Sequence, residues 1–312
     1  MDDSAPSFRP DDPFRTGRGW TPRTPFLTAG LALLTVVAAW ILGYLPWVID
    51  GFRLSGRSSA LLGEEGLDGV RLVIPLIAGE LNALIAFATL GAVAATLLPL
   101  AFVELPRMLS VVVAALVLAL TTLVLTFVAR SSIADHVPGA FSGDERVLDG
   151  LVLGVFAITF VAGLVGCIAS FQVGFLPVAT ALAVAQLPVW LGHLGDGSAG
   201  RGVVHDLVAL VMLTSAFVIS VRRSAKWMVL WPLALAIVWA ATPAQIGIGA
   251  MADRLRPGAG LQHNLSDVFA SGYDVFRASF WEAPQSWWPG VVAAGLGVVW
   301  VLVRRERVRA DR

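Results

Sequence analysis

Six polar side chains lie inside long apolar segments or at their ends, and they have the clearest capacity for chemistry. They are Glu80, Asn82, Gln186, His205, Asp206 and Gln245. An acid or an imidazole in such a segment is costly to bury unless it has a partner or faces a wet cavity. Imidazole with carboxylate can relay a proton near neutral pH or bind a cation. The set therefore predicts a polar site for a proton, a cation or a small polar solute.

Glu80 interrupts the apolar stretch 72–103, and two interpretations of it are open. If the apolar helix begins after Glu80, the acid only marks the outer water boundary. If the helix begins at Leu72, the acid lies about two turns deep and needs a partner. The candidate partners are His205, Arg71 and Arg53.

The histidines all fall on the predicted outer side of the membrane, each with an aspartate nearby in sequence. They are His136, His193, His205 and His263. Ordinary polar loop residues would show the same pattern, so both interpretations stay open for each one. His205 with Asp206 stands out, because the apolar segment 203–221 is barely long enough to span a bilayer without including them.

Composition places these residues in a membrane protein. The 312 residues are 57% hydrophobic and 14% charged, where an average soluble domain has about 25% charged residues. We expect a single transmembrane domain over residues 26–304, between a disordered tail, 1–25, and a short basic tail, 305–312. The only cysteine is Cys167, which excludes a disulfide framework.

Eight apolar segments predict an all-α bundle of about eight transmembrane helices. Each has about 17 to 25 residues, the length that a helix needs to cross the hydrocarbon core. The predicted spans are 27–47, 81–103, 108–128, 150–171, 174–191, 203–221, 227–248 and 287–303.

Charge predicts the orientation of the bundle. With both termini cytoplasmic, 13 of the 22 basic residues fall on the inner side, within the shorter loops and tails, as the positive-inside rule requires. Fifteen of the 22 acids fall on the outer side, so the outer loops are acidic and could meet a protein of the cell envelope. Arginine is used almost exclusively, with Lys226 the only lysine. We expect a multi-pass protein of a bacterial plasma membrane, with the lipid bilayer as its main partner.

Motifs that would name an enzyme are absent from the sequence. It has no HExxH, no GxSxG, no phosphate-binding GxxxxGK[ST], no dinucleotide fingerprint and no zinc-like Cys/His spacing. We therefore expect no cofactor, no metal site and no catalytic residue. Basic residues lie at predicted membrane boundaries and in tails, without a nucleic-acid-binding patch.

Three functions fit these patterns. The first is a small permease or channel-like protein with an outward-facing polar vestibule. The second is a non-transporting accessory or assembly subunit of a cell-envelope complex. The third, an enzyme acting on lipid-linked substrates, would need His205 with Asp206 or Glu80 as its polar pair.

Overall fold

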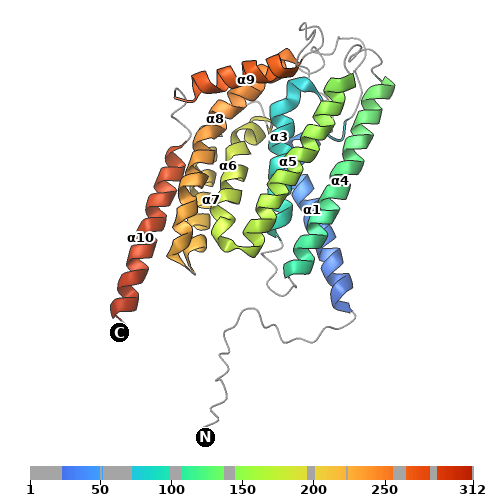
Figure 1. Ribbon diagram of the computed structural model, residues 1–312. Helices are drawn as coiled ribbons and strands as arrows, with labels where there is room; N and C mark the ends of the chain where they lie inside the picture. The colour runs from blue at the N-terminus through green and yellow to red at the C-terminus, as the bar shows by residue number, and fades with distance from the viewer. Residues whose placement is uncertain are drawn as a thin grey trace.

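The chain folds as an all-α bundle, as the computed structural model shows (Figure 1). The structure describes residues 23–49, 51, 72–98, 107–136, 145–194, 201–222, 224–255, 265–281 and 287–310. No strand occurs within these ranges. The predicted all-α fold is confirmed. Most of the N-terminal tail and most of the acidic loops lie outside the described residues.

Each predicted span coincides with a helix, and one further helix, α9, precedes the last of them. The α-helices are α1 Arg23–Ile49, α3 Leu81–Leu97, α4 Arg107–His136, α5 Glu145–Phe171, α6 Leu176–Gly192, α7 Arg201–Val221, α8 Trp231–Arg254, α9 Leu265–Ser279 and α10 Trp288–Ala310. Short 3-10 turns precede three of them: η1 Ala78–Glu80, η3 Val173–Phe175 and η4 Ala225–Leu230.

Most of these helices are long and apolar enough to cross a membrane. Six of them meet this criterion within the described residues, and two shorter apolar helices, Leu81–Leu97 and Trp288–Arg304, accompany them. Helix α1 begins, and α10 ends, at the same end of the bundle, while α9 crosses the opposite end (Figure 1). The architecture is that of a multi-pass membrane protein. We call the α9 end the outer end, following the predicted orientation.

Helix α3 occupies the centre of the bundle. It packs against α1, α5 and α6, and more lightly against α4 and α8. Its buried residues, Phe87 among them, point in all directions around the helix axis, as expected of a helix surrounded by protein. At Gly43 of α1 and Gly91 of α3 the two backbones come into direct contact, which only small residues allow.

The segment leading into α3 is buried but not helical. Leu72, Ile74, Leu76 and Ile77 are almost fully buried, and the described residues 72–80 contain no α-helix, since α3 begins at Leu81. Trp47 donates its indole N–H to the Leu72 carbonyl at 2.6 Å. Irregular backbone is tolerated among membrane helices when protein surrounds it. The interpretation in which the helix begins at Leu72 is therefore wrong, because Glu80 precedes the helix.

Trp47→Phe should lower the thermal stability of the purified protein. The substitution keeps the aromatic ring but leaves the buried Leu72 carbonyl without this donor, at a cost of about 1–3 kcal/mol. The measurement is the melting temperature in detergent. Trp281→Phe is the control, since Trp281 is exposed and makes no hydrogen bond with the described residues. Equal melting temperatures for the two variants would contradict the prediction.

Candidate functional site

Four of the predicted site residues come from three helices that pack on one another. Glu80 and Asn82 lie at the start of α3, Gln186 on α6 and Gln245 on α8. Helix α6 contacts both α3 and α8, and α8 also contacts α3 and the η1 turn. We call the group formed by Glu80, Asn82, His193 and Gln245 the polar cluster.

Glu80 pairs with a histidine from the far end of α6. Glu80 Oε2 lies 3.4 Å from His193 Nε2. Glu80 occupies the N-cap position of α3, and His193 the C-cap position of α6. The helix macrodipoles favour negative charge at the first position and positive charge at the second. Phe87 of α3 packs edge-on against the imidazole, with ring centroids 5.6 Å apart.

The other ring nitrogen of His193 determines what this pair can do. Nδ1 lies 2.8 Å from the carbonyl oxygen of Val189. A carbonyl only accepts, so Nδ1 carries a hydrogen and donates it. Nε2 of a neutral imidazole is then a lone pair, which a carboxylate would repel. The contact is attractive only with one proton shared by the two groups, held by the imidazole or by the acid. This geometry lets Glu80 and His193 share one proton.

Asn82 and Gln245 join the three helices through backbone carbonyls. The Asn82 amide nitrogen donates to the Gln245 carbonyl at 3.1 Å, and the Gln245 side chain donates to the Ala185 carbonyl at 2.7 Å. Because a carbonyl cannot donate, these bonds fix the orientation of the Asn82 amide. The Asn82 oxygen Oδ1 is buried and has no hydrogen-bond partner among the described residues. A buried acceptor of this kind calls for a donor from water or from a solute.

Gln186 lies beside the polar cluster but is not part of it. It follows Ala185 on α6, is half-buried, and makes no hydrogen bond with the described residues. Its place beside the cluster comes from the helix position, and its role stays a prediction.

His205 and Asp206 form a separate pair on α7. His205 Nδ1 lies 2.9 Å from Asp206 Oδ1, and Trp288 of α10 donates its indole N–H to Asp206 Oδ2 at 3.1 Å. The pair therefore joins α7 to α10, which pack together. The expected partnership of Glu80 with His205 is wrong: Glu80 pairs with His193, while the hydrogen-bonded partner of His205 is Asp206. The alternative partners, Arg53 and Arg71, lie outside the described residues.

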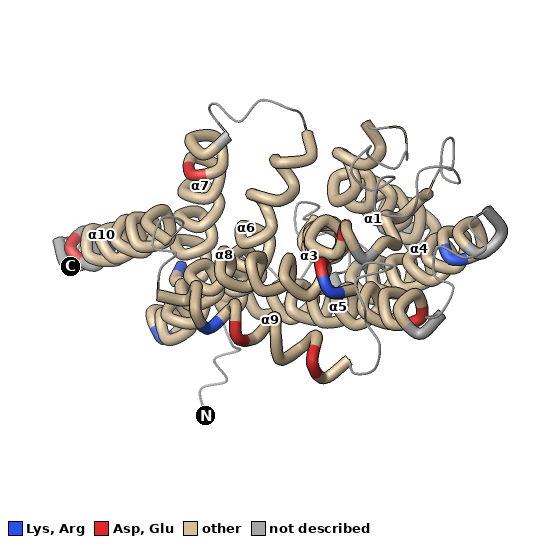
Figure 2. The backbone as a smooth tube through the Cα atoms, turned by 90° about the horizontal axis from the view of Figure 1, so that it is seen from above, with Lys and Arg blue, Asp and Glu red and all other residues tan. Residues whose placement is uncertain are grey.

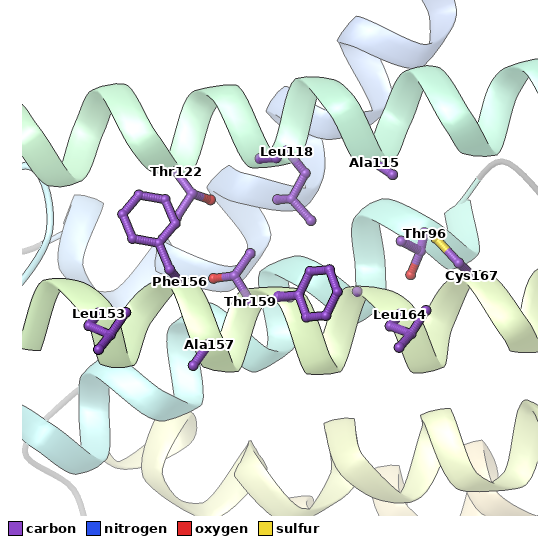
Figure 3. Close-up of a pocket in the computed structure, with 13 residues that line it drawn as sticks. Thr96, Ala115, Leu118, Thr122, Leu153, Phe156, Ala157, Thr159, Leu164 and Cys167 are labelled. Carbon is purple, nitrogen blue, oxygen red and sulfur yellow. The ribbon is translucent and has the colours of Figure 1, made fainter.

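A groove of about 500 Å³ lies between α4 and α5, away from the polar cluster (Figure 3). Its lining is apolar apart from three threonines and a cysteine: Thr96, Thr122, Thr159 and Cys167. The hydroxyl of Thr96 donates to carbonyls of its own helix. None of the described residues that line this groove is charged.

Metal binding finds no support among the described residues, where no three His, Cys, Asp or Glu side chains gather in one place. The side chain of His136 and the whole of His263 lie outside the described residues.

Comparison of the chain with protein-family models, with curated proteins and with solved structures finds no match.

His193 is the site residue that the sequence did not single out. In the sequence it is one of four outer histidines, and the aspartate near it does not set it apart from the other three. Its position directly after α6, at the outer end where α3 begins, was the available signal.

Proposed function

We propose that the chain is a small permease or channel-like protein of the plasma membrane, which admits a proton, a cation or a small polar solute from the outer side. The observation that carries the proposal is the Glu80–His193 pair, which is attractive only when it holds one exchangeable proton. Both side chains retain access to solvent, with 13% and 37% of their surfaces exposed. The pair can therefore load and release that proton.

Groups near the Glu80–His193 pair support the movement of a proton or solute further into the membrane. The buried Asn82 oxygen offers an acceptor to a solute with a donor hydrogen. Pro188 interrupts α6 and Pro243 interrupts α8, and a proline leaves the carbonyl four residues earlier without its helical partner. Such carbonyls can line a polar path between membrane helices.

Glu80→Gln and His193→Gln should each reduce proton flux into proteoliposomes by at least about tenfold. A tenfold reduction corresponds to an activation barrier that is higher by about 1.4 kcal/mol. Each substitution removes one of the two groups that share the proton. Flux is measured with an enclosed pH-sensitive dye, under a potassium diffusion potential, and then repeated with a screen of cations and small polar solutes.

Asp149→Asn is the matched control for Glu80→Gln. Asp149 is also an ion-paired acid near a helix end, 2.9 Å from Arg130, but it lies between α4 and α5 and outside the polar cluster. Its variant should transport like the native chain. If Glu80→Gln and His193→Gln transport like Asp149→Asn for protons and for every solute, the proposal fails.

An accessory or assembly subunit is the second candidate, and the separation of the two polar groups favours it. Glu80 pairs with His193, whereas His205 and Asp206 join α7 to α10, so no hydrogen bond among the described residues links the two polar groups. This candidate predicts that one envelope protein copurifies with the chain at a constant molar ratio. A chain that purifies alone, and works with every outer loop replaced, would exclude it.

A further inference from the structure

Helix α9 has three distinct sectors around its circumference. Val268 and Gly272 are buried, and they lie on the side that packs against α8. Leu265, Phe269 and Tyr273 follow at spacings of four, so they form one stripe along the helix. The charged residues, Asp267, Asp274 and Arg277, occupy the remaining sector, next to Ala270 and Ala278.

The apolar stripe is exposed, and no other described part of the chain covers it. Leu265, Phe269 and Tyr273 are 53%, 65% and 62% exposed, against 4% for Val268. Trp281, just beyond the helix, is 78% exposed. At roughly 100° per residue, the stripe borders the packed sector on one side and the charged sector on the other. The helix thus presents an apolar edge and a charged edge side by side.

The placement of α9 determines what can meet this stripe. The helix crosses the outer end of the bundle at a steep angle to the spanning helices (Figure 1). Seen from above, it lies at the rim of the bundle, with acidic positions along its outer edge (Figure 2). A helix at the rim, level with the ends of the spans, lies where lipid headgroups surround the protein.

We infer that α9 is seated in the outer-leaflet interface of the bilayer, with Leu265, Phe269, Tyr273 and Trp281 as its lipid contacts. The three sectors match such a site: one packs on protein, one dips into the boundary between headgroups and acyl chains, and one faces water. Tyr and Trp are the residues most enriched at this depth, where the ring is buried and its polar atom stays hydrated. The inference is independent of whether the chain transports anything.

Spin labels placed on the two exposed sectors test this assignment in the full chain. Single cysteines are introduced at Phe269 and Tyr273 on the apolar stripe, and at Ala270 and Ala278 on the charged sector, in a Cys167→Ser background. Each protein is reconstituted in phosphatidylcholine vesicles. Collision rates are measured with oxygen, which concentrates in lipid, and with a water-soluble nickel complex.

We expect labels at 269 and 273 to collide mainly with oxygen, and labels at 270 and 278 mainly with the nickel complex. Preference for nickel at all four positions would overturn the inference, because the stripe would face water. Shielding from both reagents at 269 and 273 would also overturn it, because a protein would then cover the stripe.

A second measurement needs no cysteine variants. The fluorescence lost on Trp281→Phe reports the native Trp281 side chain alone. That component should be quenched by lipids brominated near the headgroup end of the acyl chains, and much less by lipids brominated near the chain ends. Absence of quenching by either lipid would contradict the seated position.

Discussion

Gly43→Ala is expected to lower the melting temperature of the protein by several degrees, whereas Gly30→Ala in the same helix leaves it unchanged or raises it. A β-carbon at Gly43 would lie 2.7 Å from the Cα and N atoms of Gly91, and 2.8 Å from the Phe87 carbonyl oxygen. At Gly30 it would meet nothing within 4 Å. Both sites are in α1, so the two variants differ mainly in this contact.

The cost at Gly43 arises because the obstructing atoms belong to backbone. A side chain can change rotamer, but Gly91 and Phe87 are held within the central helix, so α1 itself must move away. Overpacking of this kind typically costs about 1–3 kcal/mol, and an alanine in place of glycine returns up to about 1 kcal/mol in helix propensity. Displacement of α1 would also strain the Trp190 indole, which donates to the Leu42 and Gly43 carbonyls at 3.0 Å.

Melting is followed by intrinsic fluorescence in detergent and again in lipid nanodiscs. Both environments are needed, since lateral pressure from lipid could hold α1 in place. The close approach of α1 and α3 would be refuted if Gly43→Ala melted together with Gly30→Ala in both.

The succession of helices was accessible from the sequence for a simple reason. Each span must be about 20 apolar residues long, and that constraint is local. The choice of neighbouring helices, in contrast, depends on contacts between residues far apart in the sequence. The central position of α3 depends on its contacts with α1, α5 and α6, and these come from small residues such as Gly43 and Gly91, whose pattern recurs throughout the chain. The buried, non-helical segment 72–77 is as apolar as a helix, so hydropathy could not distinguish the two.

For the polar cluster, too, the sequence predicted single residues but not the contacts between distant ones. Glu80, Asn82 and Gln245 were predicted because each is costly inside an apolar segment. The partner of Glu80 was not predictable, because His193 lies 113 residues away and meets it only through the packing of α6 on α3. His205 and Asp206 were singled out because the span 203–221 is short without them. The sequence gave no indication that Trp288 of α10 would bind the Asp206 carboxylate.

The outer part of α8 connects the polar cluster to α9. Gln245 follows Pro243, and its side chain and carbonyl bond to α6 and α3. Gly247, two residues further along, lies against Gly272 of α9. Movement of α9 on α8 would therefore be felt at Gln245 within a single helical turn.

Gly247→Ala is expected to destabilise the protein and to disturb the polar cluster, whereas Gly249→Ala is tolerated. A β-carbon at Gly247 would lie 2.7 Å from the Gly272 carbonyl oxygen and 3.1 Å from Phe276 Cβ. At Gly249 the nearest atom would be Asn82 Nδ2 at 3.6 Å, an ordinary contact. The two substitutions gain the same helix propensity in the same helix, so the difference between them isolates the contact with α9.

Relief of that overlap requires α9, or the end of α8, to shift as a unit, at a cost of about 1–3 kcal/mol. The melting temperature of Gly247→Ala should fall below that of Gly249→Ala by several degrees. Proton flux should fall with it, since Gln245 must keep its bonds to Ala185 and Asn82 for the cluster to retain its geometry. A Gly247→Ala protein that melts later than Gly249→Ala would refute the contact. One that melts earlier but transports normally would instead show that α9 packs on α8 without influencing Gln245.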